Sequence, residues 1–267
     1  MTDILGYSGK RVVVTGAFSG MGEAAARTLV DLGAEVWALD IKQVGVPVKE
    51  YIQTDLSKRE SIDAAVARIP AEIDALFNCA GLPGPPFSAL DTMLVNFVGL
   101  RHLTGSLLPR IPSGGAVASI TSVAGMGYKK NMESVGALLA TPDFAAGKAW
   151  CEANPEAANG YLFSKQCIIA YTKASAGPLA ERNVRINCLS PAPTDTPMMP
   201  HFHSQVPREF MDEHFQAPVG RNATAEEMAE PLVLLNSRAA RFVSGVNLFV
   251  DYGYEAQVDS GQRQGLL

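Results

Sequence analysis

Tyr161 and Lys165 are the first pair of side chains whose spacing suggests chemistry. They are four residues apart in the segment Tyr161-Leu162-Phe163-Ser164-Lys165, so a helix would place both on one face. A phenol with a pKa of about 10 is a weak base at neutral pH, but an adjacent ammonium group favours the phenolate. Upstream, Ser122 follows a predicted strand at its carboxyl end, where doubly wound sheets bind ligands. These three side chains together suggest acid–base chemistry on an oxygen atom.

A glycine-rich segment joins the first predicted strand to an alanine-rich predicted helix. It reads Thr15-Gly16-Ala17-Phe18-Ser19-Gly20-Met21-Gly22. Gly16 permits a tight turn, Gly20 lets the backbone approach a pyrophosphate, and Gly22 lets helix and strand pack closely. The first turn of the helix offers free N–H groups and the positive end of a dipole to the phosphates. A turn of this kind between a strand and a helix predicts a dinucleotide site.

Asp40 indicates which dinucleotide is bound. It ends the second predicted strand, about twenty residues beyond the glycines. A carboxylate at this place can accept hydrogen bonds from both ribose hydroxyls of the adenosine and repels a 2′-phosphate. We expect Lys42, two positions on, to be solvated. The predicted cofactor is therefore NAD rather than NADP.

The elements that must position these residues follow an alternating pattern along the chain. Short apolar segments rich in β-branched residues alternate with helical segments, as in a parallel sheet flanked by helices. The predicted strands are residues 11–15, 35–39, 51–53, 75–79, 116–120, 185–189 and 247–250. The pattern predicts the α/β class, with a single Rossmann-type, doubly wound domain over residues 1–267 and a seven-stranded parallel sheet.

Capping residues mark several predicted helices. The helix at residues 22–32 stops at Gly33, which suits the left-handed position after a helix. Ser57 with Glu60, and Thr224 with Glu227, form predicted capping boxes, in which each side chain binds a free amide at the helix start.

An insert at about residues 126–159 interrupts the alternation. It contains two predicted helical pieces, residues 132–140 and 142–152, the second starting at Thr141-Pro142. Leu138, Leu139, Phe144 and Trp150 need burial, on the parent domain or on a second subunit. The sequence leaves two interpretations of the insert open. It is either a surface decoration, or it forms a wall of the substrate site or a contact between subunits. Our hypothesis is that the insert borders both the substrate mouth and an oligomer interface, in a dimer rather than a tetramer.

Composition excludes several other classes. The chain has 267 residues, 47% of them hydrophobic, and a net charge of −5, with no basic cluster for nucleic acid. No apolar run is long enough to span a membrane, and the N-terminus has no signal pattern, so we expect a cytoplasmic protein. The four cysteines are widely spaced and are expected to be reduced core thiols. His201 and His203 are expected in a solvated loop, and no metal site is expected.

Taken together, these residues resemble the short-chain dehydrogenase/reductase family over essentially the whole chain. Residues 15–22 are similar to the family's TGxxxGxG turn, and Asp55-Leu56 to its adenine-contacting pair. Asn78-Cys79-Ala80-Gly81 resembles the NNAG motif, with Cys79 in place of the second Asn. Asn96, Ser122, Tyr161 and Lys165 match the family's catalytic residues. The resemblance implies that the cofactor-binding residues are Gly16, Phe18, Ser19, Gly20, Met21, Gly22, Asp40, Asp55, Leu56, Asn78, Ala80, Gly81, Tyr161, Lys165, Thr194 and Thr196.

Two departures from the family pattern are informative. The family's PGxVxT motif reads Pro191-Ala192-Pro193-Thr194-Asp195-Thr196, so Ala192 constrains the backbone beside the nicotinamide while Thr196 keeps its position. Ser122 and Tyr161 are farther apart than in most members because of the insert. With an insert in this place, the chain looks most like the subgroup of bacterial 3α-hydroxysteroid dehydrogenase/carbonyl reductases and coniferyl-alcohol dehydrogenases.

The resemblance implies roles for the matched residues. Tyr161 is the general base in oxidation and the general acid in reduction, Lys165 lowers its pKa and holds the nicotinamide ribose, and Ser122 binds the substrate oxygen. Asn96 fixes a water that continues a proton relay from Lys165. Many members form dimers or tetramers through the helices containing Asn96 and Tyr161, so a homodimer or homotetramer is expected.

An apolar substrate suits the residues around these positions. The candidate walls are Leu82, Pro83, Pro85, Pro86, Met126, Met198, Met199, Phe202 and Phe215, which favour a hydrophobic alicyclic or aromatic alcohol or ketone. Two alternatives are a sugar epimerase of the same fold and a dinucleotide-sensing protein without turnover. The short C-terminal region argues against the first, and the complete set of catalytic residues against the second.

Overall fold

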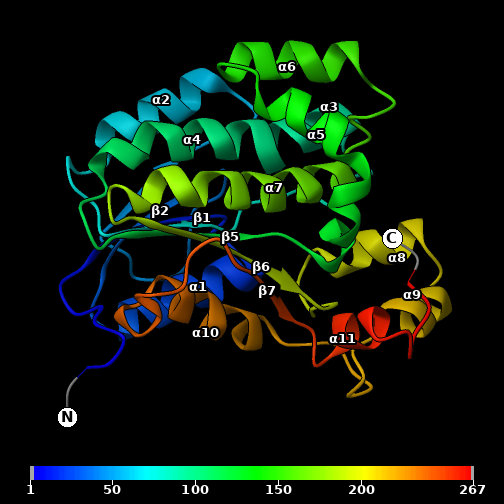
Figure 1. The fold of residues 1–267 in the computed structure, drawn as a ribbon. Helices are drawn as coiled ribbons and strands as arrows, with labels where there is room; N and C mark the ends of the chain where they lie inside the picture. Colours follow the sequence, from blue (N-terminus) through cyan, green and yellow to red (C-terminus); the bar gives the residue numbers. More distant parts are fainter. Residues whose placement is uncertain (1–2, 266–267) are drawn as a thin grey trace.

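Seven parallel strands form the centre of the molecule, in the order β3-β2-β1-β4-β5-β6-β7 (Figure 1). The computed structural model describes residues 3–265. Its strands are β1 (Arg11–Thr15), β2 (Glu35–Asp40), β3 (Glu50–Gln53), β4 (Ala75–Asn78), β5 (Ala116–Ile120), β6 (Arg185–Pro191) and β7 (Asn247–Val250). The strand order reverses between β1 and β4, where Thr15 is paired with Asn78. The predicted doubly wound α/β fold is confirmed, and this reversal is where such sheets bind ligands.

Strand limits differ from the prediction by one or two residues at several ends. β2 extends to Asp40 and β6 to Pro191, whereas β4 stops at Asn78, one residue before the predicted end. Asp40 is the last residue of β2, as its predicted role requires, and this fixes its backbone beside the carboxyl end of β1.

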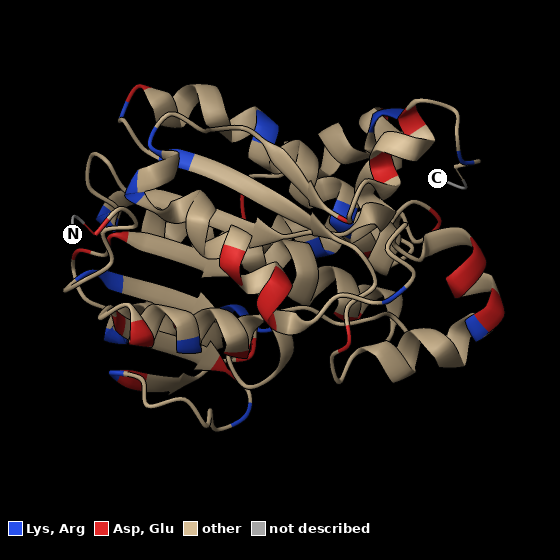
Figure 2. Ribbon diagram, turned by 90° about the horizontal axis from the view of Figure 1, so that it is seen from below, with Lys and Arg blue, Asp and Glu red and all other residues tan. Residues whose placement is uncertain are grey.

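Helices cover both faces of the sheet (Figure 1). On one face lie α2 (Arg59–Arg68), α4 (Leu100–Leu107) and α7 (Tyr161–Ala180), and on the other α1 (Gly20–Asp31) and α10 (Ala225–Asn236). Each layer encloses its own apolar core. Phe97, Leu103 and Ile168 are buried on the first side, and Leu29, Phe77 and Leu232 on the second. Acidic and basic residues are interspersed over the face seen from below (Figure 2).

The caps agree with the prediction at two helices and differ at a third. Gly33 follows α1 with φ +80°, and Thr224 and Glu227 form the predicted capping box of α10. The predicted box at Ser57 is wrong: α2 starts after Lys58 without a side-chain cap, because the Ser57 hydroxyl donates to Asp55 instead, at 2.6 Å.

The insert folds as two helices, α5 (Met132–Leu139) and α6 (Phe144–Ala153), preceded by the 3₁₀ segment η3 (Val123–Asn131). Thr141-Pro142 does not start α6, because the side chain of Asp143 caps it by accepting from the amide of Ala146. Leu138 and Phe144 are buried against this chain's own core. For these two side chains, the apolar surface is therefore covered by the parent domain.

Arg101 in α4 fastens the insert. Its guanidinium donates to the carbonyls of Leu138 at 2.9 Å and Leu139 at 3.2 Å, at the end of α5. It also donates to the Thr141 hydroxyl at 2.7 Å and to the carbonyl of Asp143 at 3.2 Å. A partly buried cation at the end of α5 stabilises carbonyls that have no partner within the helix.

Three short helices, α8 (Met199–Gln205), α9 (Arg208–Phe215) and α11 (Tyr254–Asp259), gather at the end of the sheet where the strands finish (Figure 1). His201 and His203, expected in a loop, lie in α8. Arg263 donates to the carbonyls of Glu213 and Gln216 at the end of α9 and lies over the ring of Tyr254, with 4.7 Å between the guanidinium carbon and the ring centroid. Within residues 3–265, no helix is long and apolar enough to cross a membrane.

Candidate active site

The glycine turn between β1 and α1 has the predicted geometry. Gly16 and Gly20 have φ of +69° and +61°, which favour glycine. A Cβ on Gly22 would lie 2.1 Å from the carbonyl oxygen of Gly16, so only glycine allows this approach of helix to strand. Ser19 precedes α1 without capping it through its side chain, which leaves amides of the first turn available to an anion. The turn therefore fits a pyrophosphate.

Asp40 lies beside this turn. Its carboxylate accepts a hydrogen bond from the amide of Phe18 and another from the amide of Lys42, both at 3.0 Å. The ammonium of Lys42 is not directed into the site but lies over the exposed Phe18 ring, 5.0 Å from its centroid. The residue that ends β2 is thus tied to Phe18, one of the predicted cofactor-binding residues.

Asp55 and Leu56 follow β3. The Asp55 carboxylate is engaged by Ser57 and by the Lys58 ammonium at 2.9 Å, and Leu56 is buried. Their contact with an adenine stays a prediction.

The segment after β4 closes the groove beside Gly16. Thr15 accepts hydrogen bonds from the amides of Cys79 at 3.0 Å and Ala80 at 3.1 Å, which brings Ala80 against Gly16. Asn78 is turned sideways within the sheet, where its amide donates to Thr104 at 3.0 Å and Ser119 at 3.2 Å. Asn78 thus braces the strands behind the groove, while the backbone of Ala80 and Gly81 faces it.

Ser122, Tyr161 and Lys165 come together at the carboxyl end of β5. Thr121 donates to the carbonyl of Lys165 at 3.0 Å and so joins β5 to α7. The Lys165 ammonium donates to the carbonyl of Ile120 at 3.1 Å and lies 5.4 Å from the centroid of the Tyr161 ring. The sequence prediction that these side chains meet is consistent with this geometry.

Burial decides the pKa values in this cluster. It raises the pKa of the Tyr161 phenol, while the hydrogen bond with Ser122 acts in the opposite direction. It also lowers the pKa of the Lys165 ammonium to about 8, against a smaller opposing effect of the Cys79 thiol. A lysine that titrates near neutrality beside a buried phenol forms a pair able to exchange protons with a substrate oxygen.

Asn96 lies in a wide, π-helical turn, η1 (Leu94–Gly99), and is fully buried. Its side chain accepts from the amide of Leu82 at 2.7 Å and donates to the carbonyl of Leu82 at 3.0 Å and to Ser164 at 3.1 Å. Its side-chain oxygen and the Lys165 ammonium both lie close to Gly81, 3.5 Å and 3.7 Å from the position that a Cβ on this glycine would take. Asn96 therefore holds the 81–82 backbone next to Lys165, and the predicted water relay stays a prediction.

Thr194 and Thr196 lie beyond β6. Thr194 is buried and donates to the carbonyl of Ala192 at 2.8 Å. The methyl of Thr196 lies 3.2 Å from the position that a Cβ on Gly20 would take. Thr196 thus borders the glycine turn across the groove, as expected of a cofactor-binding residue.

The helix α8 covers the catalytic cluster. The ring of Phe202, one of the candidate walls, packs edge-on against Tyr161 with 5.0 Å between centroids. Sequence reasoning missed Gln205, on the same helix, and Arg263, which holds α9. Neither residue lies in a motif, and both act through contacts between segments far apart in sequence.

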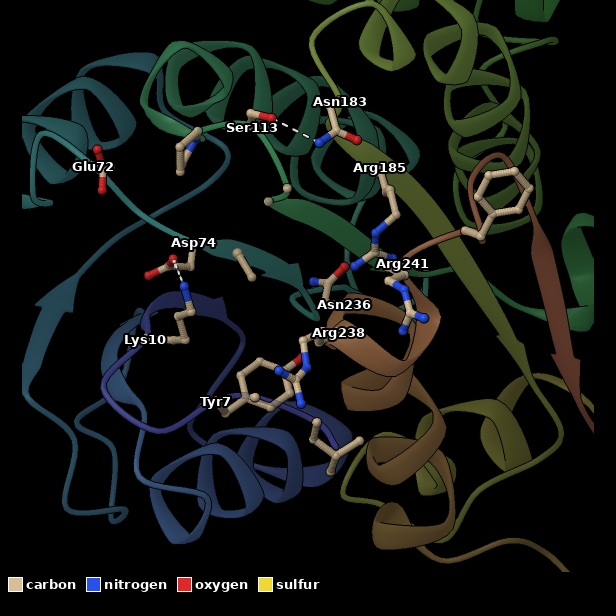
Figure 3. Close-up of a pocket in the computed structure, with 17 residues that line it drawn as sticks. Tyr7, Lys10, Glu72, Asp74, Ser113, Asn183, Arg185, Asn236, Arg238 and Arg241 are labelled. Carbon is tan, nitrogen blue, oxygen red and sulfur yellow. Dashed lines mark hydrogen bonds and ion pairs between the residues drawn. The ribbon is translucent and has the colours of Figure 1, made fainter. Parts of the chain in front are cut away.

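A hollow of about 840 Å³ opens at the opposite end of the sheet, where the strands begin (Figure 3). Three of its cations contact the fold: Lys10 pairs with Asp74 at 2.8 Å, Arg185 donates to the carbonyl of Ser237, and Arg238 to the carbonyl of Asp3. Ser122, Tyr161 and Lys165 lie at the other end of the sheet, where the strands finish, so the candidate reaction site is separate from this hollow.

Comparison with known proteins agrees with the fold and the site. A model of the short chain dehydrogenase family matches residues 10–136, and one described as enoyl-(acyl carrier protein) reductase matches residues 127–255. Over 248 residues the chain is 34% identical to coniferyl-alcohol dehydrogenase of Pseudomonas sp. (strain HR199 / DSM 7063), covering 91% of this chain and 96% of that protein. The chain belongs to the short-chain dehydrogenase family of oxidoreductases.

Further relatives point to the same part of the family. The chain is 27% identical to 3-alpha-hydroxysteroid dehydrogenase/carbonyl reductase of Comamonas testosteroni, over 92% of this chain and 96% of that protein. The solved structure of 3-alpha-hydroxysteroid dehydrogenase from Pseudomonas sp. B-0831, complexed with NADH, is similar with a TM-score of 0.80 and 27% identity, covering 93% and 98% of the two chains. The predicted resemblance to this subgroup is confirmed.

Proposed function

We propose that the protein is an NAD-dependent dehydrogenase that moves a hydride between the nicotinamide and a hydrophobic alicyclic or aromatic alcohol or ketone. The observation that carries this proposal is the meeting of Ser122, Tyr161 and Lys165 beside the glycine turn, under the apolar cover of Phe202.

The residues divide the acid–base work. Tyr161 takes the hydroxyl proton of an alcohol, or returns a proton to a ketone oxygen, and Ser122 holds that oxygen by a hydrogen bond. The Lys165 ammonium stabilises the phenolate form of Tyr161. The bound nicotinamide supplies or accepts the hydride. The chain's own contribution is to orient the substrate oxygen and to hold its proton at the phenol of Tyr161.

Asp40 supports NAD as the cofactor. Its carboxylate is fixed beside Phe18 at the end of β2, and a 2′-phosphate placed there would face a negative charge. The NADH complex of the 3-alpha-hydroxysteroid dehydrogenase from Pseudomonas sp. B-0831 supports the same choice.

The substrate class rests on the cover and on the relatives. Phe202 leaves an aromatic edge over Tyr161, which suits a flat or alicyclic carbon frame better than a charged sugar. Relatives named for coniferyl alcohol and for 3-alpha-hydroxysteroids support the same class.

Four free thiols support a reducing, cytoplasmic compartment.

The test is a panel of alcohols with NAD and NADP, containing coniferyl alcohol, a 3α-hydroxysteroid, cyclohexanol and a sugar nucleotide. We expect NADH to form fastest with one of the hydrophobic alcohols. The matched control is Tyr161→Phe, which should lose about 10²–10⁴-fold in turnover while it still binds NADH. Conversion of the sugar nucleotide without net NADH would favour an epimerase, and NADH binding without turnover of any alcohol would favour a sensor.

A further inference from the structure

The position of α8 over Tyr161 depends on contacts outside the helix. The helix spans only Met199–Gln205, and a helix of this length has little stability of its own. On its inner side Phe202 packs against Tyr161, and Met199 is buried. At its last residue, Gln205 reaches across to the segment that follows β4.

The side-chain amide of Gln205 connects α8 to the backbone of residues 83–86. Its amide nitrogen donates to the carbonyl of Pro85 at 3.1 Å, with a longer contact of 3.5 Å to Pro83, and also contacts the carbonyl of His201 at 3.1 Å. Residues 83–86 have a single backbone N–H, that of Gly84, because the other three are prolines, so this segment has few donors of its own; the carbonyl of Gly84 accepts from the amide of Phe87. An uncharged side-chain amide of this length supplies such a donor.

The link lies next to the catalytic tyrosine. A Cβ on Gly84 would lie 3.7 Å from the side-chain oxygen of Gln205 and 3.8 Å from the Cβ of Tyr161. Gly84 is buried and has φ +91°, so a side chain there would be strained. The start of α7, the 83–86 segment and the end of α8 therefore meet at one point.

We propose that Gln205 is a positioning residue, which fastens α8 to the 83–86 segment and so holds Phe202 over the substrate space beside Tyr161. The inference rests on the proposed function, because it assigns to this cover a part in binding the substrate. Gln205 is solvent-exposed, and an exposed hydrogen bond is weak. The hydrogen bond of Gln205 therefore favours the conformation in which α8 covers Tyr161. It is weak enough to let α8 move away for substrate entry and product release.

The experiment compares Gln205→Met and Gln205→Glu, which lack the donor, with Gln205→Lys, which keeps one. The matched control is Ser204→Ala on the exposed side of α8, whose hydroxyl contacts only the carbonyl of His201. With the best alcohol of the panel, we expect KM to rise about three- to tenfold in the two variants without a donor. We expect kcat to change less than twofold, the Kd of NADH to stay unchanged, and the Lys variant to stay near wild type.

A second measurement does not depend on turnover. Hydrogen–deuterium exchange of the amides in residues 82–87 and 199–206 should be faster in Gln205→Met than in wild type and Ser204→Ala. Faster exchange in Gln205→Met would support the role of Gln205 in holding α8, even if the wild-type protein oxidised no alcohol. The absence of alcohol oxidation would reject the proposed function alone. Unchanged KM and unchanged exchange in an active enzyme would overturn the fastening. Equal losses of Tm, kcat and NADH affinity would also overturn it, since they indicate a general structural role.

Discussion

Lys165 has only 4% of its surface exposed, although it carries a charge. Burial lowers the pKa of its ammonium from 10.5 to about 8, while Cys79 acts in the opposite direction. A lysine whose pKa is lower in the folded than in the unfolded state binds its proton more weakly on folding. The protein is therefore destabilised at every pH below about 8, by about 3 kcal/mol for a shift of this size.

Replacement of Lys165 by Met should separate stability from activity. We expect Lys165→Met to raise the free energy of unfolding by about 1–3 kcal/mol at pH 7 and to abolish turnover. The gain should shrink as the pH rises from 8 toward 10.5, because the unfolded wild-type chain then loses the proton too. Urea unfolding at pH 7 and pH 9.5 measures this difference. A variant less stable than wild type at pH 7, or a gain independent of pH, would contradict the assignment.

Asp40 should set the cofactor preference. Ile41 is more than half exposed next to it, so an arginine there can reach a phosphate. We expect Asp40→Ala with Ile41→Arg to shift the ratio of kcat/KM for NADP over NAD upward by about 10- to 100-fold, the value of one or two charged hydrogen bonds. Ile41→Arg alone is the control and should keep the preference for NAD. A wild-type enzyme that already prefers NADP would refute this role of Asp40.

At the scale of elements, one cation joins the insert to α4, in addition to the apolar contacts of Leu138 and Phe144. Arg101 binds the end of α5 through the carbonyls of Leu138 and Leu139. It also lies close to α6, since a Cβ on Gly147 would be only 3.0 Å from the guanidinium. Burial lowers the pKa of Arg101, and the guanidinium nevertheless remains a cation at neutral pH. Its removal would take a donor from the carbonyls of Leu138, Leu139 and Asp143, of which Leu138 keeps Thr141 and Asp143 keeps the amide of Gly147.

We expect Arg101→Ala to lower the free energy of unfolding by about 2–3 kcal/mol, because the charged hydrogen bonds of the guanidinium to the end of α5, to Thr141 and to Asp143 are lost. Lys148→Ala in α6 is the control, since its ammonium makes only an exposed contact of 3.9 Å with Glu152. Urea unfolding and limited proteolysis of the insert are the measurements. Equal stability of the two variants would show that Arg101 does not hold the insert.

The sequence predicted elements whose signals are local. The β1–turn–α1 unit follows from apolar residues, from Gly16 and Gly22, whose Cβ atoms would clash with backbone, and from an alanine-rich helix. The Tyr161–Lys165 pair follows from helical spacing alone, and the two insert helices from composition. These features depend on neighbours within a few residues.

The features that sequence reasoning missed depend on competition and on distant contacts. Ser57 has the right spacing for a capping box, yet its hydroxyl binds Asp55, an equally local partner. Pro142 suits a helix start, yet Asp143 caps α6 with its side chain. Gln205 and Pro85 are far apart along the chain, and only the packing of α8 brings them together.

At the scale of the whole molecule, the insert occupies a face that many family members use for assembly. It packs against α7 and against η1, which carries Asn96, and buries Leu138 and Phe144 there. We infer that the insert hinders association through the bare face of these helices. We therefore propose a dimer rather than a tetramer, and the hypothesis that the insert borders the dimer interface stays a prediction.

Deletion of residues 132–152, bridged by a short glycine linker, tests this proposal. We expect light scattering to give a dimer for the wild type and a larger species for the deletion, since the apolar surface under the insert becomes exposed. We also expect a raised KM, because η3 and α7 lose a support next to Ser122 and Tyr161. Met132→Lys, at an exposed position of α5, is a control that keeps the insert and should behave as wild type. Unchanged mass together with unchanged KM would reduce the insert to a surface decoration.

The way Arg101 holds the insert also has a consequence for how such chains diverge. Most of its acceptors are main-chain oxygens, which every amino acid provides, so residues of the insert can be exchanged without loss of the fastening. A homologue without the insert has no acceptors for a buried guanidinium at this place and would carry it at a cost. We therefore expect arginine at this position and the presence of the insert to be inherited together, and an alignment of related sequences would show the two gained or lost as one unit.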